Sequence, residues 1–150
     1  MPVQQRGSKR RNSRSEVAAN AAHTPWTASF IRVSLAVNLA VLLAVVPALA
    51  LFSGADFVAA AWGPPTAARG ILLSVYAAIL VSSALLLWLY ERRADKAAAE
   101  HMVAALLGVQ VLYKVTTPFT AGASNPVALC NLAVAAVHAV TLSLLWRQHQ

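Results

Sequence analysis

The chain has 150 residues, of which 59% are hydrophobic and only 11% are charged, and its mean hydropathy is +0.61. This composition is too apolar and too poor in charge for an ordinary soluble domain, so we expect one membrane domain. The formal net charge of +7 does not indicate nucleic-acid binding, because the basic residues form blocks beside apolar segments and no aromatic residue is interleaved with them.

Residues 1–25 form a basic tail with almost no large apolar residue to bury, and we expect this tail to be disordered in water. In one interpretation the tail is a surface anchor, in which each basic residue attracts anionic lipid headgroups with on the order of 1 kcal/mol. These residues are Arg6, Lys9, Arg10, Arg11 and Arg14. In the other interpretation the tail is a cleavable targeting segment, because organelle import sequences are also rich in Arg and Ser and poor in acidic residues. The sequence favours the anchor.

The rest of the chain, residues 26–150, holds four apolar segments, each close to the length of about 20 residues that a helix needs to cross a bilayer. The predicted spans cover about residues 30–51, 69–90, 97–117 and 126–146. Pro118 is expected to end the third span, because proline interrupts the hydrogen bonds of a helix. Ser124 or Asn125 is the expected N-cap of the fourth span, with Pro126 in its first turn.

Residues 53–68 connect the first two spans, and a Gly-Pro-Pro triplet that begins at Gly63 interrupts any helix there. The part from Ser53 to Trp62 is apolar but too short to cross a bilayer. We expect an external loop that lies in the membrane interface, with Phe57 and Trp62 facing the lipid headgroups. A lid over a functional site is the alternative.

The distribution of Lys and Arg predicts the orientation of the spans. The N-terminal tail, residues 91–96 and the tail at Arg147 carry nearly all the positive charge, whereas residues 53–68 and 118–125 carry none. Both termini should therefore face the cytoplasm, the stroma or the matrix, and an even number of spans requires the same. Short connections make neighbouring spans antiparallel, so the predicted fold class is an all-α integral membrane protein, an up-down four-transmembrane-helix bundle. Small residues such as Gly108 should allow close approach between helices.

Polar side chains inside the spans are the candidate functional residues, because such groups are costly in hydrocarbon. At about 1.5 Å of rise per residue, Asn38 and His138 lie near mid-membrane, and Lys114 and Asn131 lie near the outer boundary. We expect Lys114 to approach Asn131, and His138 to approach Asn38 or a serine of the second span. Gln110 shares the Lys114 face of the third span. The predicted intramembrane binding cluster is Asn38, Gln110, Lys114, Asn131 and His138.

Each of these residues also has a purely structural interpretation. Lys114 can extend its ammonium group to the outer headgroups, and the three amides can join helices through hydrogen bonds worth about 0.6–2 kcal/mol each. His138 can be a neutral imidazole bonded to an amide or a serine. Cys130 is the single cysteine, so it can form no intrachain disulfide, and we expect it to be a small packing residue.

The sequence lacks a carboxylate well inside any span, a metal-binding cluster, a second histidine level with His138 for a haem, and phosphate-loop or nucleophile motifs. We therefore expect a protein without a cofactor or metal, and a non-enzymatic one. The leading hypothesis is an accessory or scaffold subunit that packs against other membrane proteins or further copies of itself, or binds a lipid-like molecule between its helices. The second hypothesis is a small transporter or membrane enzyme that uses Lys114 and His138 on an anionic or proton-carrying substrate. The plan of four spans in 150 residues resembles DoxX-like and other small four-helix membrane proteins, and no motif assigns the chain to a family.

Overall fold

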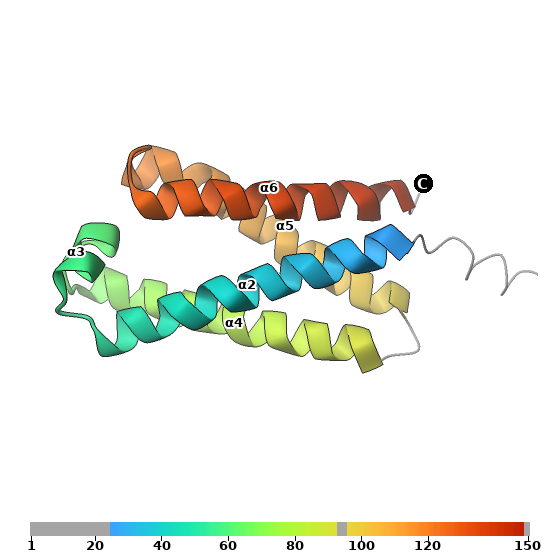
Figure 1. The fold of residues 1–150 in the computed structure, drawn as a ribbon, viewed down its shortest axis with the longest axis horizontal. Helices are drawn as coiled ribbons and strands as arrows, with labels where there is room; N and C mark the ends of the chain where they lie inside the picture. The colour runs from blue at the N-terminus through green and yellow to red at the C-terminus, as the bar shows by residue number, and fades with distance from the viewer. Residues whose placement is uncertain (1–24, 93–95, 149–150) are drawn as a thin grey trace, which may run out of the picture.

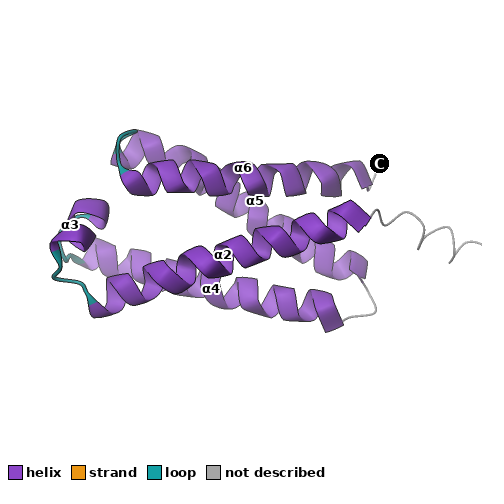
Figure 2. Cartoon of the chain, in the orientation of Figure 1, coloured by secondary structure: helices purple, strands orange, loops and turns teal. Residues whose placement is uncertain are grey.

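The computed structural model describes residues 25–92 and 96–148, and within these ranges every regular element is a helix (Figures 1 and 2). The described helices are α2 (Pro25–Leu51), α3 (Asp56–Trp62), α4 (Ala67–Arg92), α5 (Lys96–Ala121) and α6 (Pro126–Gln148). Of these, α2, α4, α5 and α6 are each long and apolar enough to cross a membrane. The predicted fold class, an all-α four-helix membrane bundle, is therefore confirmed. The basic N-terminal tail lies outside the described residues.

The four long helices are arranged as two antiparallel pairs, in which α2 packs along α4 and α5 packs along α6. The start of α2 and the end of α6 lie at one end of the molecule, which we call the terminal end, and α3 lies at the opposite end, which we call the α3 end (Figure 1). The two pairs lie close together at the terminal end and separate toward the α3 end, so the bundle is wedge-shaped.

Two clusters of buried apolar side chains account for the wedge. The terminal cluster draws on all four long helices and comprises Ile31, Leu35, Leu86, Tyr90, Ala99, Val103, Leu107 and Leu145. The α3 cluster draws only on α2, α3 and α4 and comprises Leu42, Leu49, Val58 and Tyr76. Burial of apolar surface therefore joins the two pairs at the terminal end, whereas at the α3 end it only joins α2 and α4 to the short helix between them.

The third long helix does not end where the sequence predicted. α5 continues past Pro118 to Ala121. The proline removes one backbone donor, the one that would bond to the carbonyl oxygen of Lys114, and the helix continues without that bond. The chain then turns at Gly122, whose φ of 93° is rarely adopted by residues with a side chain. The prediction that Pro118 ends the helix is wrong, because a glycine cap ends it one turn later.

Asn125 caps α6, as predicted from its place before the apolar run. Its Oδ1 accepts a hydrogen bond from the backbone N–H of Val127 at 2.8 Å, which satisfies one of the donors left free at the helix start. Its Nδ2 also donates to the carbonyl oxygen of Ala61 at 3.2 Å. The same side chain therefore caps α6 and ties it to α3.

Gly108 was expected to allow close approach between helices. A Cβ atom built at this position would meet nothing within 4 Å, so that expectation is wrong. The buried positions of α5 recur at spacings of three and four residues, through Val103, Leu107, Gln110 and Lys114, and Gly108 is not among them.

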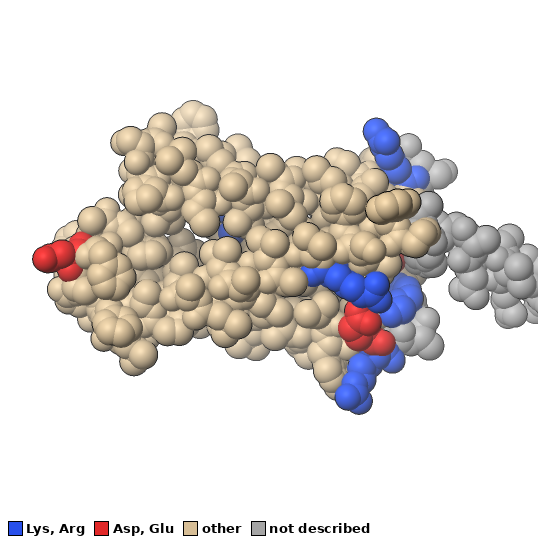
Figure 3. Space-filling model, in the orientation of Figure 1, with Lys and Arg blue, Asp and Glu red and all other residues tan. Residues whose placement is uncertain are grey.

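Charged side chains gather at the terminal end of the described chain (Figure 3). There Arg32 Nε lies 2.6 Å from Glu91 Oε1 and joins the start of α2 to the end of α4, with both side chains about half exposed. The Arg32 guanidinium also lies 5.9 Å from the centre of the Tyr90 ring. An exposed ion pair contributes only about 0–1 kcal/mol, so this contact marks the end of the apolar region more than it holds the bundle together.

Candidate functional site

A cavity of about 230 Å³ lies between the two helix pairs, in the half of the bundle nearer α3. Its lining is mainly apolar, with a few polar groups that include Asn38, Lys114 and Asn131. The space-filling view shows the surface hollowed between α2 and α6 on this side, with basic atoms visible inside the hollow (Figure 3). An apolar cavity of about 150 Å³ is large enough to admit benzene, so this one has room for a larger small molecule.

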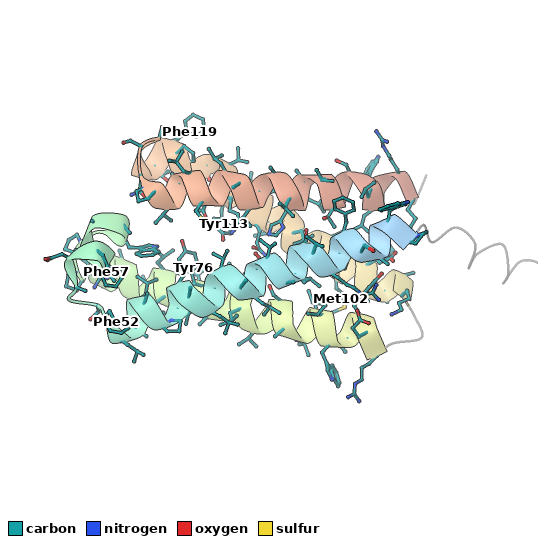
Figure 4. All side chains as sticks on the ribbon, in the orientation of Figure 1. Phe52, Phe57, Tyr76, Met102, Tyr113 and Phe119 are labelled. Carbon is teal, nitrogen blue, oxygen red and sulfur yellow. The ribbon has the colours of Figure 1, made fainter. Side chains whose placement is uncertain are left out.

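A second cavity, of about 420 Å³, adjoins the first on the side of α4 and α5. The two share the lining residues Ala61, Trp62, Tyr76, Tyr113 and Val127. The side-chain view places Tyr76 and Tyr113 in the space between the helix pairs, whereas Phe119 points away from the bundle (Figure 4). The site therefore extends across the wedge from one gap between the pairs to the other.

Lys114 lies inside the bundle, with only 4% of its surface exposed. Its Nζ donates to the hydroxyl oxygen of Tyr113 at 2.6 Å and lies 4.6 Å from the centre of that ring. In the described part of the chain Lys114 forms no ion pair. The salt bridge found there joins Arg32 to Glu91. The expectation that Lys114 extends to the outer headgroups is wrong, since its ammonium group lines the cavity instead.

Lys114 and Asn131 line the same cavity but do not bond to each other. Asn131 Nδ2 donates to Thr117 Oγ1 at 3.2 Å, and the Thr117 hydroxyl in turn donates to the backbone of Tyr113. The structure thus brings the two predicted residues to one site, and each of them is held by a neighbour on α5. Both residues line one cavity, as the expected approach requires, and each bonds to a different neighbour.

The predicted contact between His138 and Asn38 is confirmed. His138 Nε2 lies 3.0 Å from Asn38 Oδ1, and Asn38 Nδ2 donates to Ser83 Oγ at 3.2 Å. Because Oδ1 can only accept, the bond requires the His138 tautomer that carries its proton on Nε2. His138 is fully buried and does not line the cavity, whereas Asn38 does. Asn38 therefore connects the cavity to a buried polar layer.

This polar layer adjoins the cavity at Asn38 and reaches the level of the terminal cluster at Ser34. Besides Asn38, His138 and Ser83, it contains Ser34 and Thr141, whose hydroxyl oxygens are 2.8 Å apart. All of these side chains are buried. The layer ties α2 to both α4 and α6, and beyond it the terminal cluster fills the space between the four long helices.

Gln110 is fully buried, as its position on the Lys114 face predicts, but it does not line either cavity. Its Oε1 and Nε2 have no hydrogen-bond partner among the described residues. The interhelical bond expected of this amide is therefore not formed within that part of the chain, and an unpartnered buried amide costs about 1–3 kcal/mol. The structure does not bring Gln110 into the site with Lys114.

The short helix α3 covers the end of the cavity. Trp62 lines the cavity, so the prediction that Trp62 faces the headgroups is wrong, whereas Phe57 is exposed as expected. Arg69 of α4 is buried beneath α3, and its guanidinium donates to the carbonyl oxygens of Gly63, at 2.6 Å, and of Ser53. These bonds fix both ends of the α3 segment to α4, so α3 is placed as a lid.

Sequence reasoning missed several residues of the site. Tyr113 and Cys130 are each next to a predicted residue along the chain, but neighbours on a helix face different directions, so adjacency alone was no signal. Cys130 is exposed and lines the cavity, which corrects its interpretation as a packing residue. Arg69 did carry a signal, because it is a cation immediately after a loop region that otherwise contains no Lys or Arg.

The site therefore combines an apolar cavity with one buried cation, amide groups and tyrosine hydroxyls. Such an arrangement can hold an amphipathic molecule by its polar end. Comparison of the chain with known protein families, with curated proteins and with solved structures finds no match, so the functional argument rests on this geometry.

Proposed function

We propose that this small multi-pass membrane protein is a non-enzymatic binder of a lipid-like molecule, which it holds in the cavity between its two helix pairs. The observation that supports this proposal is the cavity of about 230 Å³, mainly apolar and with a few polar groups on its wall. Small-molecule sites generally have this composition, in which apolar side chains provide contact area and a few polar groups orient the ligand.

The shape of the bundle favours a ligand over a purely structural role. The terminal cluster draws on all four long helices, whereas the α3 cluster draws only on α2, α3 and α4, so the two helix pairs leave a mainly apolar pocket between them. The pocket opens to the surface between α2 and α6 (Figure 3), so a small molecule can enter it from outside the bundle.

Cys130 provides a direct test, because it is the single cysteine and lies at the cavity. The purified full-length protein in lipid nanodiscs is treated with a thiol reagent, with and without a panel of fatty acids, fatty alcohols, isoprenoids and sterols. We expect at least one class of molecule to slow the labelling of Cys130 severalfold by occupying the cavity.

The matched control carries Cys130→Ala together with Leu132→Cys, because Leu132 is exposed on the same helix and does not line the cavity. A cavity ligand leaves the labelling of this variant unchanged. Equal slowing at both positions, or no slowing of Cys130 by any member of the panel, would contradict the proposed function.

The second candidate function is a small transporter or membrane enzyme that uses Lys114 and His138. The bond between Asn38 and His138 supports it, because it couples the cavity to the buried polar layer. The support is weaker, since His138 does not line the cavity in which Lys114 lies. In this case Lys114→Ala and His138→Ala should each abolish transport or turnover while membrane insertion and folding are unchanged, whereas loss of folding alone indicates a structural role.

A further inference from the structure

We infer that the ligand of this site is a single-chain amphiphile with a carboxylate headgroup, of the fatty-acid class, and that Lys114 is the residue that binds the carboxylate. This inference rests on the proposed function and adds to it the charge and the chemistry of the ligand. It follows from the charge of the cavity, from its free hydrogen-bonding capacity and from its size.

The charge of the cavity is positive. Lys114 is the cation in its lining, and among the described residues no acidic side chain lines this cavity or the adjoining one. A buried ammonium group without a counter-ion loses most of its hydration, at a cost of several kcal/mol. An anionic ligand supplies the missing counter-charge inside the protein, whereas a neutral lipid of the same shape leaves the ammonium group uncompensated.

The hydrogen-bonding groups around Lys114 are matched to an acceptor. An ammonium group has three donors, and in the described structure Lys114 uses one of them on the Tyr113 hydroxyl. The amide of Asn131 is already engaged by two neighbours, because its Nδ2 donates to Thr117 Oγ1 and the side chain also forms a hydrogen bond with the Tyr76 hydroxyl. A carboxylate accepts through both oxygens and donates nothing, so it can take the two remaining donors of Lys114.

The size and the remaining surface of the cavity favour a single chain. One cation matches one negative charge, and the volume of about 230 Å³ suits a small headgroup with the first part of a chain. The apolar part of the lining includes Val41, Leu42 and Val45 of α2 and Val134 of α6. These side chains offer the chain an apolar path out of the cavity, toward the gap between the helix pairs.

The test compares oleate with oleyl alcohol, which share one chain and differ in the headgroup. Each is titrated against the full-length protein in phosphatidylcholine nanodiscs, and the rate of Cys130 labelling reports occupancy. In the native protein we expect oleate to give half-maximal protection at a concentration at least about tenfold below that of the alcohol, because a hydrogen-bonded charge pair contributes more than a neutral bond.

Three variants identify the residue responsible. Lys114→Gln should raise the half-protective concentration of oleate by about tenfold or more and leave that of the alcohol unchanged, so that the preference disappears. Lys114→Arg keeps the charge and should retain most of the preference. Arg147→Gln, at the terminal end, is the matched removal of a distant cation and should change neither concentration.

The outcomes separate this inference from the proposed function. Equal protection by oleate and the alcohol in the native protein, or a preference that survives in Lys114→Gln, overturns the carboxylate inference while ligand binding stands. Protection by phosphatidic acid but not by oleate overturns the choice of headgroup. If neither oleate nor the alcohol protects Cys130, the carboxylate inference is overturned. If no member of the wider panel protects Cys130, the proposed function is overturned as well. If Lys114→Gln fails to fold, the comparison of the two ligands on the native protein still decides the headgroup, and Lys114→Met, which also removes the charge, takes its place in testing the residue.

Discussion

His138 and Asn38 lie 100 residues apart in the sequence and form a direct hydrogen bond between α6 and α2. This contact could be predicted because the regular rise of a helix, about 1.5 Å per residue, converts sequence position into depth in the membrane. Two polar groups at the same depth in an apolar bundle have few other partners available. Depth alone did not predict that Asn38 also bonds to Ser83 and so links three helices.

A double-mutant cycle tests the strength of this contact. Asn38→Ala leaves buried groups of His138 and Ser83 without their partner, so we expect it to lower the free energy of unfolding by about 1–3 kcal/mol. The coupling energy between Asn38→Ala and His138→Ala should be about 0.6–2 kcal/mol, the range measured for hydrogen bonds between membrane helices. Reversible unfolding in mixed detergent micelles provides both values.

Ser143→Ala is the control for this cycle. The Ser143 hydroxyl is exposed and bonds to the backbone of Ala139 in its own helix at 2.8 Å, so its removal should change the stability little. Strict additivity of the Asn38 and His138 substitutions would show that their bond contributes nothing to the bundle.

Lys114 shows how far a single polar residue can be interpreted from sequence. Its position on the inner face follows from the spacing of buried residues along α5. Its surroundings do not follow, because a lysine side chain is long enough to reach either the membrane boundary or the interior. The choice depends on Tyr113 and on the unfilled space beside it, and no local pattern encodes either.

At the scale of helices, the long elements were predictable and the short one was not. A run of about 20 apolar residues is sufficient to predict a membrane-spanning helix. α3 has only 7 residues, which is too short to be stable as an isolated helix, so it depends on tertiary contacts. Those contacts come from Arg69 and Asn125, which bond to backbone carbonyls in and beside α3.

Arg69→Gln should loosen the lid. The guanidinium bonds two carbonyl groups that flank α3, and glutamine is too short and has too few donors to replace both. We expect the labelling of Cys130 by a water-soluble thiol reagent to rise severalfold in the absence of ligand, while the helical content measured by circular dichroism stays the same.

Arg92→Gln is the matched control for Arg69→Gln, because Arg92 lies on the same helix at the terminal end, where its guanidinium is 5.5 Å from the centre of the Trp88 ring. This variant should label at the native rate. An unchanged rate in Arg69→Gln would refute the description of α3 as a lid.

Replacement by alanine should change the stability of the protein in opposite directions at two glycines of the α5 region. Gly122 has a φ of 93°, so Gly122→Ala places a side chain in a left-handed conformation and should cost about 1–2 kcal/mol. Gly108 lies inside α5 with open space around it, so Gly108→Ala should gain about 0.5–1 kcal/mol through helix propensity. Thermal unfolding of the two variants in the same detergent measures the difference, and shifts of the same sign would contradict the glycine cap.

At the scale of the whole molecule, composition was sufficient to predict the fold class but not the wedge. A membrane-spanning helix is apolar on nearly all faces, so its pattern does not reveal which face is buried against a neighbour. The sparse polar residues mark the inner faces, and the buried ones are distributed along the bundle from Thr27 near the terminal end to Lys114 in the cavity. Some apolar residues, such as Leu107 and Leu145, belong to the cluster that joins all four long helices. The packing of the complete structure decides which residues these are.

We propose that the terminal end faces the cytoplasm, the stroma or the matrix, because the described cations Arg92, Lys96 and Arg147 lie there and Arg69 is bonded to carbonyls beside α3. The orientation is tested with single cysteines introduced into a Cys130→Ala background. Ser53→Cys should react with a membrane-impermeant thiol reagent in intact cells or organelles, whereas Arg147→Cys should react only after permeabilisation. The reverse pattern would invert the orientation.

With this orientation, we propose that the basic residues of the N-terminal tail attract the anionic lipids of the same leaflet. Replacement of Arg6, Lys9, Arg10, Arg11 and Arg14 by Gln should weaken the enrichment of anionic lipid around the purified protein, by on the order of 1 kcal/mol for each charge removed. Lipid analysis of the native and substituted proteins extracted in native nanodiscs measures this enrichment. Equal lipid content would leave the targeting interpretation of the tail as the better one.

The terminal cluster has a mechanical consequence for the cavity. Of the two apolar clusters in the described part of the chain, it is the one that contains residues of both helix pairs, so we expect it to act as a pivot about which the pairs move. The bond from Asn125 to Ala61 connects α6 to α3 and restrains this motion at the far end. Over a helix of 26 residues, a rotation of about 5° at the pivot displaces the far end by about 3 Å. We therefore expect small changes in the packing of Ile31, Val103 or Leu145 to alter the width of the site at the α3 end.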